Sequence, residues 1–336
     1  MTKPRISLKD LALELGISIS TVSRALKNHP DISVELTAKV QQLAAAKNYS
    51  PNPLAMGLLK QQTRMIGVIV PDIVTHFYAS IISGIEEVAK EIGYYIVIAS
   101  SGESVEKERE SVENLLKTRV EGFIVCLSQQ TSVFDHFNRL VDMEIPLVFF
   151  DRVAQNMAVP SVTVDGAEAA RQITRHFFKN GRRRIAYISG PDYLNISLQR
   201  KAGYLDGLNE CGLTFDSGLL ATCNLNTNEA ALATRELLKR KPIPDAIFGI
   251  NDTVAFAAMK EIRKHGLKIP EDIALVGFTD EFHATVVEPA LTSVTHPTLQ
   301  MGREAARLFF NRIALGAGYA EKVVLPTTLV IRDSSK

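Results

Sequence analysis

The chain has 336 residues, of which 46% are hydrophobic and 22% charged, and its net charge is +1. No apolar run approaches the roughly 18 uncharged residues that span a bilayer, and the N-terminal residues carry charges where an export signal has an apolar stretch. These totals exclude a membrane protein and predict a globular protein of about two or three domains in the cytoplasm.

The charge is divided unevenly along the chain. Residues 1–62 carry eight Lys and Arg against four Asp and Glu, a net charge of +4, whereas the remainder carries 30 against 33, a net charge of −3. A basic segment on a nearly neutral body is typical of proteins that bind nucleic acid through one end.

The first helix is predicted over residues 8–15, where apolar residues recur on one face. Ser7 is placed to cap its first turn, and Gly16 follows it at a point where the chain must reverse. Ser18 can cap a second helix, in which Val22, Ala25 and Leu26 point inward. A third helix starts after Ser33, so the pattern predicts a helix-turn-helix.

The second helix leaves Ile19, Ser20, Ser23 and Arg24 on its outer face. Short hydroxyl side chains let a helix approach base edges, and an arginine can bind guanine or phosphate in the major groove. A three-helix bundle with a solvated, serine-rich face accounts equally well for the apolar spacing. It does not explain why Ile19 is left at the exposed start of the helix.

Residues 49–64, YSPNPLAMGLLKQQTR, contain two prolines and then space for only about two helical turns. One interpretation is a tether whose apolar residues dock on the body. The other is a hinge helix that folds only against DNA and inserts a leucine between base steps in the minor groove.

From residue 65 onward, strands and helices alternate in two sets, which predicts two doubly wound parallel-sheet α/β lobes. We expect strands at residues 66–70, 94–99, 122–125, 146–150, 184–189, 246–250 and 273–277. We expect helices at residues 78–92, 105–117, 134–143, 167–179, 197–211, 228–240 and 253–265. Residues 291–295 and 297–315 are expected to return to the first lobe.

Polar residues follow several of these strands, where parallel sheets bind ligands. They are Asp72, Asp151, Arg152, Asn251, Asp252, Thr279 and Asp280. With Phe77 and Tyr78 nearby, they suit a small molecule rich in hydroxyl groups. Each could instead cap a helix; this favours Asp252 as a cap and leaves Asn251 open. The motifs of nucleotide-binding, serine-hydrolase and zinc-protease sites are absent, and we expect no catalytic residue, cofactor or metal.

The chain resembles the lactose/galactose-repressor family of bacterial transcription regulators over essentially its whole length. The segments that carry the resemblance are SLKDLALELGISISTVSRALKN, NYSPNPLAMGL, IGVIVPDI, FFDR, GRRRIAYISGP, IPEDIALVGF and PALTSV. The resemblance implies a helix-turn-helix head on two lobes of periplasmic-binding-protein type. It also implies a homodimer on a near-palindromic, double-stranded DNA operator.

By matching position, the resemblance implies that Ile19, Ser20 and Arg24 read bases and that Ser18, Thr21 and Ser23 lie near phosphates. It implies that Leu58 intercalates at the operator centre. The complete DNA-binding set is Ser18, Ile19, Ser20, Thr21, Ser23, Arg24, Asn28, Ala55 and Leu58. Met56 departs from the family, because many relatives have an arginine at that position.

The effector-binding set implied by the resemblance is His76, Phe77, Tyr78, Asp151, Arg200, Phe248, Asn251 and Asp280. Two departures indicate a ligand that differs from lactose and purines. Thr75 and His76 replace the family's Asn-Pro, and Thr279 stands where the family has its first acidic residue after Gly-Phe.

We therefore predict a sequence-specific DNA-binding repressor controlled by a small carbohydrate-like effector. Its domains are a helix-turn-helix at residues 1–50, a hinge at 51–63 and an effector-binding, dimerising core at 64–336. The first lobe is predicted to contain approximately residues 64–162 and 292–324, and the second approximately residues 163–291 and 325–336. The alternatives are control by a corepressor or a partner protein, and a sugar-binding protein or sugar-processing enzyme without a regulatory role.

Overall fold

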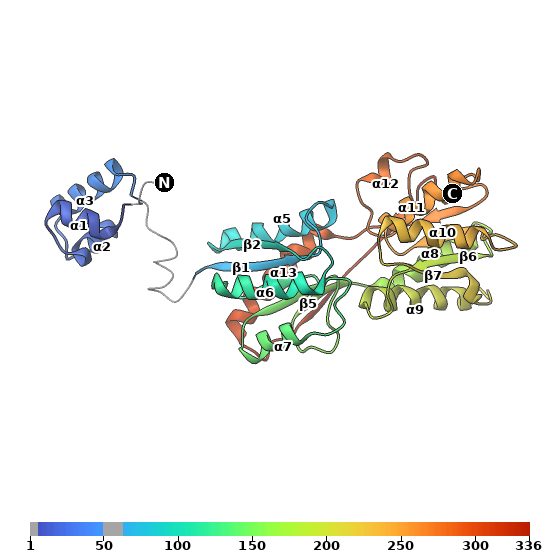
Figure 1. The fold of residues 1–336 in the computed structure, drawn as a ribbon, viewed down its shortest axis with the longest axis horizontal. Helices are drawn as coiled ribbons and strands as arrows, with labels where there is room; N and C mark the ends of the chain where they lie inside the picture. Colours follow the sequence, from blue (N-terminus) through green and yellow to red (C-terminus); the bar gives the residue numbers. More distant parts are fainter. Residues whose placement is uncertain (1–5, 50–62) are drawn as a thin grey trace. The chain divides into compact units, whose positions relative to one another are not determined.

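The computed structural model describes residues 6–49 and 63–336 of the chain (Figure 1). The chain divides into two compact units, residues 1–63 and residues 64–336, which we call the head and the core. Ala55 and Leu58, in the predicted hinge, lie outside the described residues. Within the described residues, no helix is both long enough and apolar enough to cross a bilayer.

The head contains the three predicted helices, α1 (Leu8–Leu15), α2 (Ile19–Leu26) and α3 (Val34–Ala46). Ser7 and Asp10 form a reciprocal capping box at the start of α1, and Gly16 ends that helix with φ +65°, a conformation that glycine adopts without strain. Ser18 and Ser33 cap α2 and α3 through their hydroxyl oxygens. Because these caps and the glycine turn depend on neighbouring residues only, the limits of the helices could be predicted from the sequence.

One small core holds the three helices of the head together. Its fully enclosed residues come from all three helices: Leu11, Ala12, Val22, Ala25, Val40 and Ala44. Because α1 and α2 are joined only by the turn at Gly16, their packing on α3 fixes α2 on the surface of the head. The structure thus has the predicted helix-turn-helix arrangement.

The first lobe of the core is built on a six-stranded parallel sheet with the strand order β11-β5-β4-β3-β1-β2. Its strands are β1 (Met65–Val70), β2 (Tyr95–Ser100), β3 (Phe123–Val125), β4 (Leu147–Phe150), β5 (Ser161–Val164) and β11 (Lys322–Leu325). Its helices are α5 (His76–Glu91), α6 (Val105–Lys117), α7 (Asp135–Asp142) and α13 (Thr298–Leu315).

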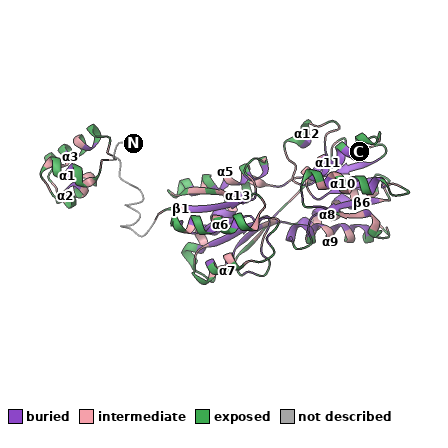
Figure 2. Ribbon diagram, in the orientation of Figure 1, coloured by how far each residue is buried: buried purple, intermediate pink, exposed green. Residues whose placement is uncertain are grey.

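Alternate side chains of these strands enter different cores. In β1, Ile66, Val68 and Val70 pack in the cluster that includes α5 and α13. Ile69 packs on the opposite face, in the cluster that includes α6 and α7. A sheet covered by helices on both faces needs apolar residues at every position, which explains the uninterrupted apolar run at the start of the core. Figure 2 shows the buried strands between helices with exposed outer faces.

The second lobe has a four-stranded parallel sheet with the order β7-β6-β8-β9. Its strands are β6 (Ile185–Ser189), β7 (Leu220–Thr222), β8 (Ala246–Gly249) and β9 (Ala274–Val276). Its helices are α8 (Gly166–Lys179), α9 (Asn195–Glu210), α10 (Thr227–Leu238) and α11 (Asp252–Lys264). Smaller elements are η1 (Ser217–Leu219), α12 (His283–Val286), β10 (Ser293–Val294) and β12 (Leu329–Val330).

Two predictions about the lobes were wrong. Residues 291–295 do not return to the first lobe, because Thr292 is bridged to Val276 at the end of β9 and β10 pairs with β12. The return is made by α13, which packs along α5. The predicted limits at 162 and 324 also fall inside β5 and β11, both of which belong wholly to the first sheet.

The packing of α9 on α8 depends on a glycine and yields a test of the fold. A Cβ atom at Gly203 would lie 1.9 Å from the carbonyl oxygen of Ala167, so the two backbones are in close contact there. We expect Gly203→Ala to lower the free energy of unfolding of the core by about 1–3 kcal/mol, as overpacking does. Denaturant unfolding measures this. Gly318→Ala is the control, because its Cβ would meet nothing within 4 Å; equal losses for both variants would contradict the prediction.

Candidate DNA-binding surface and effector cavity

The N-terminus of α2 presents a cluster of hydroxyl groups at the surface of the head. The Ser18 hydroxyl lies 2.7 Å from the Ser20 hydroxyl and 2.8 Å from that of Thr21, and it accepts a hydrogen bond from the Thr21 N–H. Ile19 is 47% exposed, whereas Val22 and Ala25 on the opposite face are fully buried. The structure therefore places an apolar side chain and three hydroxyls together on the accessible start of the helix.

The remaining predicted DNA-binding residues of the head follow along α2. Arg24 is exposed, with its guanidinium 4.0 Å from the carboxylate of Asp31, and Ser23 is half-buried. Asn28 lies just beyond the helix with φ +54°, and its side-chain oxygen accepts a hydrogen bond of 2.8 Å from Gln41 on α3. The amide of Asn28 thus connects the end of α2 to α3.

The core contains a cavity of about 390 Å³ lined by both lobes. From the first lobe it is lined by Pro71, Asp72, Thr75, Phe77, Tyr78, Ser100, Gly102, Glu103, Asp151 and Arg152. From the second it is lined by Ile196, Arg200, Leu225, Asn251, Thr253, Thr279 and Glu281. Most of these residues follow the carboxyl ends of parallel strands or begin the next helix, which is where such sheets bind ligands. The volume suits a small molecule.

Aromatic side chains at the start of α5 form one part of the wall. The rings of Phe77 and Tyr78 meet edge to face, with centroids 5.0 Å apart. Phe77 also meets the ring of His296 edge to face at 4.9 Å. Burial raises the pKa of the Tyr78 hydroxyl well above its ordinary value, so this group stays a neutral hydrogen-bond donor or acceptor.

Arg200 brings a buried positive charge to the cavity from α9. Its guanidinium donates a 2.6 Å hydrogen bond to the carbonyl of Ile250 and stacks 3.6 Å above the ring of Phe278. Burial lowers the pKa of Arg200, and the carboxylate of Asp151 acts in the opposite direction. The Nε atom of Arg200 is buried and has no hydrogen-bond partner within the described part of the chain.

Asp151 follows β4 with φ +55°, so its carboxylate is directed by a left-handed turn that aspartate tolerates better than most residues. It lies 3.7 Å from the Nε2 atom of His296, which is enclosed. Burial lowers the pKa of His296 to about 4, although Asp151 raises it in part. The imidazole is therefore neutral near pH 7 and adds no charge that would offset that of Asp151.

Asn251, whose role the sequence left open, is the cap of α11, and Asp252, which the sequence favoured as a cap, is not. Asn251 caps α11 by accepting a 2.9 Å hydrogen bond from Val254, and it also lines the cavity. Asp252 is buried and accepts hydrogen bonds from the Ser293 hydroxyl and the Glu281 N–H. Burial raises the pKa of Asp252 to about 6. Asp252 thus connects the segment after β9 with β10 through hydrogen bonds. The prediction that Asp252 caps α11 was wrong.

Three predicted effector residues do not line the cavity. Phe248 is enclosed in β8, stacked 4.6 Å from the ring of Tyr187. Asp280 instead forms a 2.6 Å ion pair with Arg332. His76 is exposed at the first position of α5, with its ring 6.0 Å from those of Phe282 and His283. The other five predicted residues, Phe77, Tyr78, Asp151, Arg200 and Asn251, all contribute to the wall.

Sequence reasoning missed Glu103, Thr253 and Glu281 as cavity residues. Glu103 could have been found, because it follows the predicted strand at residues 94–99 and the same strand-end rule applies to it. Glu281 carried the same signal, because it follows the predicted strand at residues 273–277. Its backbone N–H donates to Asp252, so a contact between distant segments brings it to the wall.

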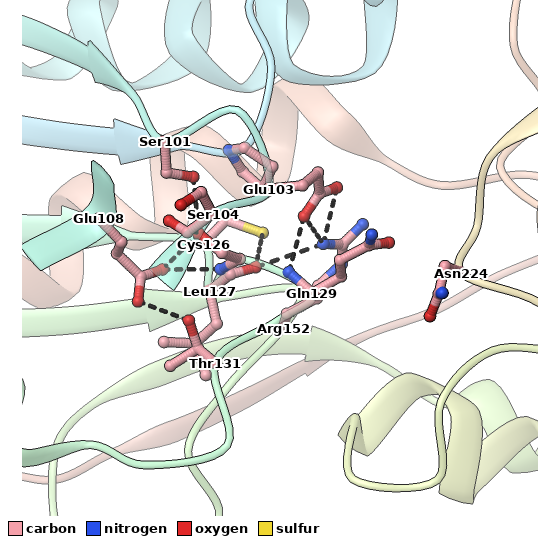
Figure 3. Close-up of polar contacts among 12 residues, drawn as sticks. Ser101, Glu103, Ser104, Glu108, Cys126, Leu127, Gln129, Thr131, Arg152 and Asn224 are labelled. Atoms are coloured by element: carbon pink, nitrogen blue, oxygen red, sulfur yellow. Dashed lines mark hydrogen bonds and ion pairs between the residues drawn. The ribbon is translucent and has the colours of Figure 1, made fainter. Parts of the chain in front are cut away.

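A polar network on the first lobe supports the cavity wall at Glu103 (Figure 3). Both carboxylate oxygens of Glu103 accept hydrogen bonds from Arg152, at 3.0 and 2.7 Å. Behind it, the fully buried Glu108 accepts hydrogen bonds from the N–H and hydroxyl of Ser128, at 2.7 and 2.9 Å. Thr131 donates a third at 2.7 Å. A buried carboxylate with this many donors holds the loops around it in one arrangement.

A head with an exposed recognition helix, joined in one chain to a two-lobed ligand cavity, defines a ligand-responsive DNA-binding regulator. Residues 7–52 match the bacterial regulatory proteins of the lacI family, and residues 63–332 match the periplasmic binding proteins and sugar binding domain of the LacI family. The chain belongs to the LacI family of transcriptional repressors, which confirms the predicted family and fold.

Relatives match this chain over nearly its whole length. The chain is 28% identical to the HTH-type transcriptional repressor CytR of Escherichia coli (strain K12), over 98% of this chain and 96% of that protein. It is 30% identical to catabolite control protein A of Priestia megaterium, over 98% and 99%. A solved structure of the transcriptional regulator CelR with cellobiose is 29% identical, with a TM-score of 0.74 and coverage of 98% and 100%.

The buried His296 gives a pH-dependent test of the cavity. Its folded pKa of about 4 lies below the ordinary value of 6.5, so the unfolded chain binds its proton first as the pH falls. We expect wild type to lose stability relative to His296→Gln between about pH 6.5 and pH 4, by up to about 3 kcal/mol. Denaturant unfolding across this range measures it. Groups common to both proteins, Asp252 included, cancel in the comparison, and a difference that is constant with pH would contradict the prediction.

Proposed function

We propose that this protein binds a near-palindromic operator as a homodimer and that a hydroxyl-rich small molecule in the core cavity controls that binding. The observation that carries the proposal is a single chain that joins an exposed, hydroxyl-rich recognition helix to a cavity with polar walls from two lobes. Acting on chromosomal DNA places the protein in the cytoplasm.

The start of α2 is the proposed reading surface. Ile19 offers an apolar contact to a thymine methyl, and Ser20 and Arg24 reach base edges, whereas Ser18, Thr21 and Ser23 contact the backbone. The Ser18 hydroxyl holds its two neighbouring hydroxyls in place, which lowers the ordering cost on binding. Leu58, with Ala55 beside it, is proposed from the sequence alone to enter the minor groove.

Dimerisation is supported by apolar side chains that the core leaves in contact with solvent. Val74 is 86% exposed, and Ile73, Phe282 and Val286 are each more than half exposed. They lie beside the start of α5 and at α12, and the rings of His76 and Phe282 connect these two regions. A large exposed apolar patch is typical of a surface that a second chain covers.

The mechanism we propose is a shift between two arrangements of the lobes. A ligand held by both lobes favours the arrangement in which both walls reach it, and it shifts the equilibrium only by its differential affinity for the two arrangements. The change in lobe angle would alter the spacing of the two heads and thereby the pairing of the hinge segments. The wall carries hydrogen-bonding groups but no recognised catalytic set, so we propose binding without turnover.

The second candidate is control by a corepressor or a partner protein in place of an inducer. The names of two relatives, catabolite control protein A and CytR, identify both as regulators and do not indicate a common effector.

The experiment that tests the main proposal is selection of sheared DNA from the organism of origin by the purified protein, at low and moderate salt. Enrichment of a few near-palindromes that persists at moderate salt supports it. Uniform retention that vanishes with salt means phosphate contacts alone and contradicts it.

Arg24→Ala tests the reading surface. Removing an arginine that contacts a base is expected to weaken binding to the selected operator by about 1–3 kcal/mol while leaving binding to random DNA nearly unchanged. Fluorescence anisotropy with both DNAs measures this. The matched control is Lys39→Ala, which removes another exposed positive charge of the head, one that pairs with Glu35 on α3. Equal losses on both DNAs would assign Arg24 to phosphate.

Asp151→Asn tests the effector cavity. Asparagine tolerates the left-handed backbone at this position and keeps the shape of the side chain, but it removes the charge that accepts ligand hydroxyls. We expect effector affinity to fall at least about tenfold, corresponding to about 1.4 kcal/mol, with operator affinity in the absence of effector unchanged. Calorimetry and anisotropy measure the two quantities. An unchanged effector affinity would place the ligand elsewhere.

A further inference from the structure

The walls of the cavity carry more negative than positive charge. Four carboxylates line it, from Asp72, Glu103, Asp151 and Glu281, against the two guanidinium groups of Arg152 and Arg200, which gives a net charge of −2. Lys107 lies at the rim beside Gly102, and the excess remains acidic when this lysine is included. The cavity therefore presents an environment that disfavours a further negative charge.

Each arginine already donates to the protein from one terminal nitrogen, although the Nε atoms of both are buried without a hydrogen-bond partner among the described residues. One terminal nitrogen of Arg152 donates to both oxygens of Glu103 and, at 3.4 Å, to the carbonyl of Leu127. Arg200 donates to Ile250 and stacks on Phe278. The pKa of Arg152, which burial alone would lower, is raised well above its ordinary value by Tyr78 and Glu103, so its positive charge persists but is matched within the wall.

Glu103 is held in this position from two sides. Its Oε2 atom also accepts a 2.7 Å hydrogen bond from the N–H of Gln129. The adjoining Ser101 accepts a 2.6 Å hydrogen bond from Ser128, which in turn is bound to the buried Glu108. Moving the Glu103 side chain away from Arg152 to admit an anion would break its hydrogen bonds with Arg152 and Gln129, and Figure 3 shows the side chains of Glu103 and Arg152 directed at one another.

The other three carboxylates of the wall, those of Asp72, Asp151 and Glu281, are not hydrogen-bonded to an arginine within the described residues as Glu103 is. Asp151 lies 3.7 Å from the neutral His296, and its charge acts to raise the pKa of Arg200. Burial raises the pKa of Glu281, and the charges of His283 and His76 act in the opposite direction. Ionised carboxylates accept hydrogen bonds from hydroxyl or ammonium groups and repel phosphate and carboxylate groups.

We infer that the cavity selects neutral or cationic polyhydroxyl effectors over phosphorylated or carboxylated ones, and that Glu103 sets this selection by occupying Arg152. The inference rests on the proposed function and deepens it. Glu103 is a specificity-determining residue, because its ion pair with Arg152 keeps that arginine from binding an anionic ligand. Arginine without such a partner is a strong phosphate ligand.

The first experiment dialyses the full-length wild-type protein against a metabolite extract of the organism of origin and identifies the enriched compounds by mass spectrometry. Enrichment of a compound without phosphate or carboxylate supports the inference. Enrichment of a sugar phosphate or a sugar acid overturns it and leaves the proposed function standing. Enrichment of no compound at all overturns the proposed function and this inference together. This experiment needs no variant.

The second experiment compares Glu103→Gln with wild type by calorimetry, using the enriched compound and its phosphorylated derivative at two salt concentrations. The amide keeps an oxygen for Gln129 but releases the charge of Arg152. We expect wild type to prefer the neutral compound by at least about tenfold, a preference that weakens with salt, and the variant to lose most of it. Glu110→Gln, an exposed change of equal charge on α6, should keep it. An unchanged preference in Glu103→Gln overturns the role of Glu103.

Discussion

The carboxyl ends of two parallel sheets meet around one cavity, and the rest of the core depends on that arrangement. Helices cover both faces of the central strands, so the chain must turn from strand to helix at the same edge of each sheet. Polar residues at these turns, such as Asp151 after β4 and Asn251 after β8, are directed to a common space. The fold thereby gathers residues that are about 100 positions apart in sequence.

Electrostatic balance within the wall determines what this space can hold. Arg200 and Arg152 are buried charges, and each is stabilised by contacts with the protein: a carbonyl and an aromatic ring for Arg200, a carboxylate for Arg152. A buried charge without such partners would be strongly unfavourable. The same contacts that stabilise the arginines limit their availability to a ligand, which connects the stability of the lobes with the specificity of the cavity.

The head follows a different principle, because its binding surface is local. Ser18 caps α2 and at the same time positions the hydroxyls of Ser20 and Thr21, so one side chain both begins the helix and arranges its outer face. The apolar side of α2 is used to pack against α1 and α3. A change on the outer face can therefore alter DNA contacts with little effect on the packing of the head.

The sequence by itself determined what depends on neighbouring residues: the caps and turn of the head, the alternation of strands and helices, and the residues Phe77, Tyr78 and Asp151 near the strand ends. Arg200 was implied only by the resemblance to the family. The sequence pattern missed β5 (SVTV) and β7 (LAT), because their polar residues interrupt the apolar run that revealed strands of similar length such as β3 and β9. Only the tertiary structure placed Phe248 in the core, paired Asp280 with Arg332 and joined the Glu281 N–H to Asp252. Those positions depend on contacts between segments far apart in the chain, which local patterns do not encode.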